Sequence, residues 1–95
     1  MTEQHQDGRQ RAIELLEANH TFPGDYRFQV IALGTEAVSA AVLAAAGVGP
    51  EADDTRASSA GKYLSHRVTV HVASAVEVLD LYARLRAVEG VVTVL

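Results

Sequence analysis

The sequence predicts an α+β protein, a ferredoxin-like βαββαβ sandwich in which a four-stranded antiparallel sheet carries two helices on one face. Two sets of segments predict this fold. Residues 25–33 and 62–73 alternate between apolar and other side chains, a pattern that is typical of strands. Residues 36–46 and 75–88 have apolar side chains at helical spacing, and each segment follows a residue that can cap a helix. With a short apolar segment over residues 91–95, their order matches the split βαβ arrangement.

The chain is expected to begin with a disordered stretch over residues 1–8, because MTEQHQDG is polar throughout. A short helix is expected over residues 9–19, in which Ile13 and Leu16 lie at helical spacing. Residues 9–95 together are predicted to form a single domain, since a chain of 95 residues encloses one small core.

The first predicted strand places its aromatic and β-branched side chains on one face, namely Tyr26, Phe28, Val30 and Ala32. Gly34 then turns the chain, and Thr35 is suited to cap the helix over residues 36–46. This helix is rich in alanine, which predicts close packing on the sheet before Gly47 ends it.

The second strand is expected near residues 55–59, a polar stretch that suits the edge of a sheet. A hairpin turn follows, in which Gly61 is expected to supply a positive φ angle. The third strand then turns three valines toward the helices: Val68, Val70 and Val72.

The last helix starts with a capping-box pattern, Ser74 followed by Glu77, and ends before Gly90. Its Leu85 is predicted to lie in the core. Right-handed crossovers place the first and third strands in the centre of the sheet, so the predicted strand order is 4-1-3-2.

One face of this sheet is predicted to carry no helices, and the residues expected there form a candidate interaction face: Arg27, Gln29, Ile31, Thr69 and His71. A homodimer or an unknown protein partner is expected to use this face or the neighbouring edge strand. A solvated monomer is the alternative that the sequence leaves open.

Composition excludes several classes of function. Twelve acidic and eight basic residues give a formal charge of −4, which argues against nucleic-acid binding. The chain contains no cysteine, so thiolate metal sites and a cysteine nucleophile are excluded. Because no signal peptide and no long apolar run occur in it, the protein is expected to be cytoplasmic, with no membrane contact.

Titratable residues predict no active site, metal site or cofactor. His66 and His71 are expected on opposite faces of one strand, which prevents shared chelation, and both are interpreted as solvated. Glu51, Asp53 and Asp54 are interpreted as a solvated acidic turn, which offers no desolvated carboxyl group for acid–base catalysis. The protein is therefore predicted not to be an enzyme.

The segment SSAGKY over residues 58–63 is not a phosphate-binding P-loop. That motif needs a glycine where Arg56 stands and a hydroxyl residue where Tyr63 stands. The structural interpretation of this segment is a hairpin turn that binds no ligand. An anion site formed by Ser58, Ser59 and Lys62 is the functional alternative.

Three motifs carry a resemblance to a known family. Phe22-Pro23 with Tyr26–Ile31 resembles the FP…F-x-[YF]-K-V-[IM]-G start of YbeD-like proteins. Ser58–Ser65 is similar to their SSKG-x-Y-x-S block, and Leu81–Leu85 to their LY-x-x-L helix. The match covers residues 11–95 in the same order. Ala60, where the block usually has lysine, and Ala32-Leu33, which precede Gly34, depart from the family pattern.

YbeD-like proteins are small bacterial proteins of unknown function with an ACT-like, ferredoxin-like fold. The resemblance implies a regulatory or protein-interaction module without catalytic activity. By the same analogy, the alternative is an ACT-like domain that binds a small metabolite such as an amino acid. The residues expected to bind a small-molecule ligand are Gly34, Thr35, Ser58, Ser59 and Lys62.

Overall fold

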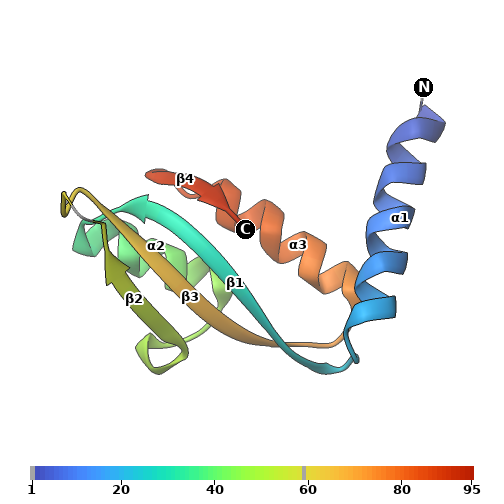
Figure 1. The fold of residues 1–95 in the computed structure, drawn as a ribbon, viewed down its shortest axis with the longest axis horizontal. Coiled ribbons are helices and arrows are strands. Elements are labelled where there is room, and N and C mark those ends of the chain that lie inside the picture. Colours follow the sequence, from blue (N-terminus) through green and yellow to red (C-terminus); the bar gives the residue numbers. More distant parts are fainter. Residues whose placement is uncertain (1, 59) are drawn as a thin grey trace.

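A computed structural model describes residues 2–58 and 60–95, with only the backbone described for residues 2–7. It is an α+β structure compatible with the ferredoxin-like arrangement (Figure 1). The elements, in chain order, are α1 (Thr2–Asn19), β1 (Gly24–Leu33), α2 (Glu36–Ala46), a 3₁₀ turn (Pro50–Ala52), β2 (Asp53–Ala57), β3 (Tyr63–Val72), α3 (Ala75–Arg86) and β4 (Val91–Val94).

The four strands form one antiparallel sheet in the order β2-β3-β1-β4, which reads β4-β1-β3-β2 from the other edge. The two ten-residue strands β1 and β3 are central and pair along their whole length, from Gly24 opposite Val72 to Leu33 opposite Tyr63. Figure 1 shows α2 and α3 on the same side of this sheet. The molecule therefore has two layers, and one face of the sheet has no helix over it.

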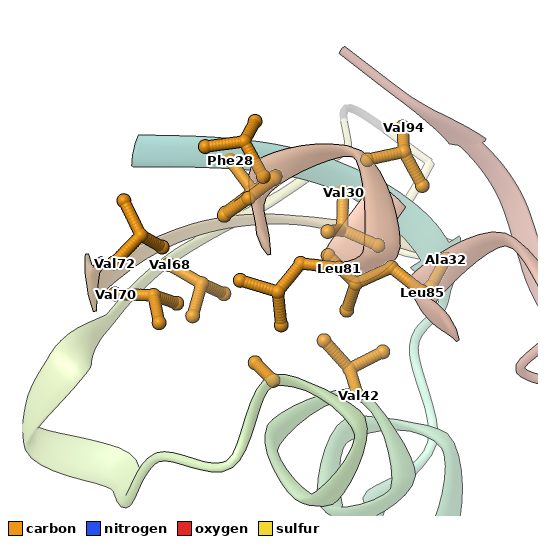
Figure 2. Close-up of a cluster of buried hydrophobic side chains, with 12 residues drawn as sticks. Phe28, Val30, Ala32, Val42, Val68, Val70, Val72, Leu81, Leu85 and Val94 are labelled. Atoms are coloured by element: carbon orange, nitrogen blue, oxygen red, sulfur yellow. The ribbon is translucent and has the colours of Figure 1, made fainter. Parts of the chain in front are cut away.

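Alternation along the central strands places the core between the sheet and the helices. Phe28, Val30 and Ala32 on β1 are completely buried, as are Val68 and Val72 on β3. They meet apolar side chains from the helix layer and from β4 (Figure 2), chiefly Val42, Val78, Leu81, Leu85 and Val94. The predicted inward-facing set on both strands is confirmed, except that Tyr26 is only partly buried at its margin.

Local signals at the ends of the elements are also confirmed. The Thr35 hydroxyl accepts a hydrogen bond from the Val38 N–H, and the Ser74 hydroxyl accepts one from the Glu77 N–H. In the hairpin between β2 and β3, Gly61 adopts a φ angle of 73°, and its N–H donates to the Ser58 carbonyl. A left-handed residue is required there, which explains the glycine.

The structure shifts β1, β3 and β4 by one residue at one or both ends and corrects three other predicted boundaries further. The N-terminal helix begins at Thr2 instead of residue 9, so residues 2–8 are helical, while Met1 lies outside the described residues. The predicted helix starts at residue 9 because apolar side chains at helical spacing occur only after it. Glutamate and glutamine favour a helix even where no apolar face is present. β2 spans Asp53–Ala57 instead of residues 55–59, because its pairing with β3 starts at Asp53. α3 ends at Arg86, two residues before the predicted end.

Helix α1 is an addition to the two-layer sandwich. Leu16 packs against the core cluster, while Leu15 is 58% exposed. Figure 1 shows α1 beside the start of α3, at the opposite end of the molecule from β2. This position leaves both the open face of the sheet and the β2 edge clear of α1.

Candidate functional site

The open face of the sheet is a surface that the fold leaves without a covering layer of helices (Figure 1). All five residues of the candidate interaction face lie on it, because they alternate with the buried residues of β1 and β3. The strand register sets Arg27 opposite Thr69, and it sets Gln29 opposite Arg67, which also lies on this face. Gln29 Nε2 also donates a hydrogen bond to Ser65 Oγ at 3.2 Å.

Two arginines occupy the centre of this face. Arg27 on β1 and Arg67 on β3 are diagonal neighbours across the central strand pair, and both line two adjoining hollows. The first, of about 230 Å³, extends to the 3₁₀ turn and the start of β2, where Glu51 and Asp54 line it. The second, of about 360 Å³, extends to Leu95. Arg67 is not among the predicted interaction residues. It alternates with the buried valines of β3, however, so the same pattern places it on the open face.

The guanidinium groups of these two arginines are available to a ligand. Within the described part of the chain, neither Arg27 nor Arg67 forms an ion pair. Asp54 stands opposite Arg67 in the strand register, but the two side chains do not come within ion-pair distance. Guanidinium binds carboxylate or phosphate through two parallel hydrogen bonds, so the face is suited chemically to an anionic group.

The second predicted site is assembled from two distant segments. The Gly34 N–H donates to the Lys62 carbonyl at 2.9 Å, which brings the loop after β1 against the β2–β3 hairpin. Two hydroxyls of this site are already engaged: Thr35 caps α2, and Ser58 accepts from the Tyr63 N–H at 3.2 Å. Ser59 lies outside the described residues. The remaining polar group, the Lys62 ammonium, lies 5.4 Å from the centre of the Tyr63 ring.

An apolar hollow of about 390 Å³ lies beside the same loop. The residues that line it come from the end of β1, the start of α2 and the turn before β4: Leu33, Ala37, Val38, Ala41, Glu89 and Gly90. Glu89 is the one charged residue among them. Small and apolar side chains suit this hollow to an apolar group more than to an anion.

The interpretation of His66 and Asp53 as solvated residues is wrong. His66 is completely buried, and its Nδ1 lies 2.8 Å from Oδ2 of Asp53, whose side chain is only 7% exposed. His66 shares the inward parity of the β3 valines, and Asp53 stands opposite Val68 on the same face. The parity of His66 was visible in the sequence, whereas the register of β2 was not. Glu51 and Asp54 are exposed, as expected.

One atom of each side chain in this buried pair has no partner among the described residues. His66 Nε2 and Asp53 Oδ1 are buried without a hydrogen-bond partner in the described structure, so no hydroxyl is hydrogen-bonded to the ring. Nucleophilic catalysis needs a nucleophile within hydrogen-bond reach of its base. Over residues 2–58 and 60–95, no three histidine, aspartate or glutamate side chains gather in the geometry of a metal site.

Comparison with known protein families assigns the chain to one family. A family model described as "Protein of unknown function (DUF493)" matches residues 17–95. The chain belongs to this family. DUF493 is the YbeD-like family that the motifs indicated. Neither the curated proteins nor the solved structures include a match to this chain. In the described part of this DUF493 protein, no helix has the length and apolar character needed to cross a membrane.

Proposed function

We propose that this DUF493 protein is a small cytoplasmic regulatory module without catalytic activity, which binds an acidic segment of a protein partner on the open face of its sheet. The observation that supports this function is the pair formed by Arg27 and Arg67, two cations without ion-pair partners in the described structure at the centre of an uncovered surface. Carboxylates of the partner occupy the hollow lined by Arg27, Gln29, Arg67 and Leu95 and are held by guanidinium hydrogen bonds.

Charge distribution favours this occupant. The chain as a whole carries a formal charge of −4, whereas the open face concentrates three arginines on neighbouring strands: Arg27, Arg56 and Arg67. Glu51, Asp53 and Asp54 line the hollow toward β2, whereas Arg27 and Arg67 line the hollow toward Leu95, whose described lining residues include no acidic side chain. An acidic segment is therefore attracted to the hollow toward Leu95, which favours one orientation of encounter. Ile31, half-buried beside these arginines, and Leu95, 62% exposed, add apolar contact area at the β4 side.

A glutamate-rich peptide is the direct probe of this proposal. We expect amide chemical shifts on β1 and β3 to move as the peptide is added, with binding that weakens as salt is raised. Arg27→Ala combined with Arg67→Ala should weaken binding by at least about tenfold, since charge-assisted hydrogen bonds contribute about 1.5–3 kcal/mol each.

Arg11→Ala combined with Arg84→Ala is the matched control, because these exposed arginines lie on α1 and α3. This variant loses the same charge but should bind the peptide as the wild type does. Equal weakening in both double variants, or shifts confined to the helix layer, would contradict the proposed docking face.

A second candidate function is supported by the apolar hollow beside Gly34 and Thr35. In this alternative the protein is an ACT-like domain that binds a small metabolite, such as an apolar amino acid, in that hollow. A thermal-shift screen of amino acids tests it, since a ligand at 100 times its Kd adds about 2.7 kcal/mol of stability. Ala37→Phe fills the hollow and should abolish any shift, whereas Arg27→Ala should leave the shift unchanged.

A further inference from the structure

The outer edge of β2 is open. β2 pairs with β3 on one side only, and Figure 1 shows it at the margin of the sheet, with α1 far away. Asp54, Thr55 and Arg56 are all exposed. An edge strand presents unpaired N–H and C=O groups that pair readily with another strand.

We propose that a second copy of this chain pairs antiparallel with β2 across a two-fold axis centred on Thr55, which joins two four-stranded sheets into one continuous sheet. Such an interface is isologous, because the same strand serves both copies. The proposal rests on the residue order Asp-Thr-Arg and on the face each side chain occupies; it shares Arg56 with the open face but makes no use of Arg27 or Arg67.

Geometry limits the registers that this pairing can adopt. A two-fold axis perpendicular to the sheet keeps the open faces of both copies on the same side, so opposed residues must share a face. Residues that share a face differ by an even number along the strand. Of the interior positions of β2, the axis can therefore pass through Asp54, Thr55 or Arg56.

Charge selects one of these three registers. An axis through Asp54 or Arg56 sets that residue opposite its own copy, and like charges directly opposed are destabilising. An axis through Thr55 sets Asp54 of each copy opposite Arg56 of the other, which forms two ion pairs on the open face. The same register pairs the two Thr55 side chains on the other face, a favourable cross-strand pair.

Both charged residues are unengaged in the single chain. Asp54 and Arg56 form no ion pair with any residue that the structure describes. β2 itself is held against β3 by the pairing of the two strands and by the buried hydrogen bond between Asp53 and His66. A five-residue strand buries less area than a standard interface, so we expect a reversible, salt-sensitive dimer.

Sedimentation velocity across a concentration series, at low ionic strength, tests the pairing. The wild type should form dimers as concentration rises. Asp54→Arg and Arg56→Asp should each raise the dimer Kd by at least about tenfold, since each variant opposes like charges at two points. Asp25→Arg is the matched control, because Asp25 is exposed on the same face at the far end of β1, and it should dimerise as the wild type does.

An equimolar mixture of Asp54→Arg and Arg56→Asp chains supplies the decisive result. In a mixed pair each introduced charge meets an opposite one, so dimers should return at concentrations where each variant alone is monomeric. A variant that fails to fold cannot give this rescue. A wild type that stays monomeric at all concentrations, or a mixture that stays monomeric beside a dimeric wild type, would overturn the proposal.

Discussion

Two histidine–aspartate pairs lie on opposite faces of the sheet, and water reaches only one of them. His66 and Asp53, 2.8 Å apart, have side chains that are 0% and 7% exposed on the helix-covered face. His71 and Asp25, 3.1 Å apart, have side chains that are 71% and 70% exposed on the open face. Similar contacts thus serve different ends: a buried polar group needs its partner, whereas an exposed group exchanges its partner for water at little cost.

This contrast extends to the two faces as wholes. Strand geometry sends successive side chains to opposite faces, so β1 and β3 each contribute to the core and to the open surface. The covered face accounts for stability, since its side chains are apolar and fully buried. The open face carries arginine, glutamine and threonine at half-buried or exposed positions, and changes there should affect binding more than folding.

The largest expected loss of stability comes from truncating the core. Leu85→Ala removes a completely buried side chain and should lower the free energy of unfolding by about 2–5 kcal/mol. Leu15→Ala, at a 58% exposed position on α1, should change it by less than about 0.5 kcal/mol. Urea unfolding measures both. Similar losses in the two variants would mean that α3 does not turn Leu85 into the core.

Removing the carboxylate from each histidine pair should give the next largest difference. Asp53→Ala leaves the buried His66 ring without any hydrogen-bond partner among the described residues and should cost about 1–3 kcal/mol. Asp25→Ala removes an exposed contact and should cost less than about 1 kcal/mol. Urea unfolding measures both variants. Equal shifts of the two midpoints, with unchanged slopes, would mean that the burial of the His66–Asp53 pair has no energetic consequence.

High pH should weaken the covered side through Tyr82. Burial, and then the hydrogen bond with the Tyr26 hydroxyl at 3.1 Å, raise the pKa of Tyr82 above its ordinary value. Between about pH 10 and this raised pKa, the unfolded chain releases a proton that the folded chain retains. The free energy of unfolding should therefore fall as pH rises through this window. Tyr82→Phe should flatten that decline, and an unchanged slope in this variant would contradict the assignment.

Only a small effect on stability is expected from the open face. Ile31→Asp combined with Thr69→Glu adds charge to half-buried positions on β1 and β3, and should shift unfolding by less than about 1 kcal/mol. The same variant should lose affinity for a glutamate-rich peptide, because it surrounds Arg27 and Arg67 with negative charge. A cooperative unfolding transition with unaltered peptide affinity would show that the open face is not the docking surface.

Much of the fold could be predicted from side-chain patterns alone. Alternation in Tyr26–Ala32 and Val68–Val72 identifies the two central strands and the face that each side chain occupies. Thr35 and Ser74 mark helix starts because their hydroxyls satisfy backbone N–H groups that no helical carbonyl reaches. These signals are local, so a single sequence contains them.

Other features depend on contacts between distant residues. Asp53 has low intrinsic preference for a strand, and its burial follows from a β2–β3 register that places it beside His66. The proximity of Gly34 to Lys62 likewise requires the tertiary fold. The start of α1 was missed for a different reason, because helix propensity in a polar stretch carries no periodic signal.

The aromatic corner near α1 gives this chain a built-in spectroscopic reporter. The protein has three tyrosines and no tryptophan, so its near-ultraviolet absorbance and intrinsic fluorescence come chiefly from Tyr26, Tyr63 and Tyr82. The rings of Tyr26 and Tyr82 lie 6.2 Å apart, edge to face, and each is 4.9 Å from Phe28. Tyr63 stands apart, at the β2–β3 hairpin. A Tyr63→Phe chain would therefore emit almost entirely from the helix-covered layer, so that its unfolding could be followed without any attached dye.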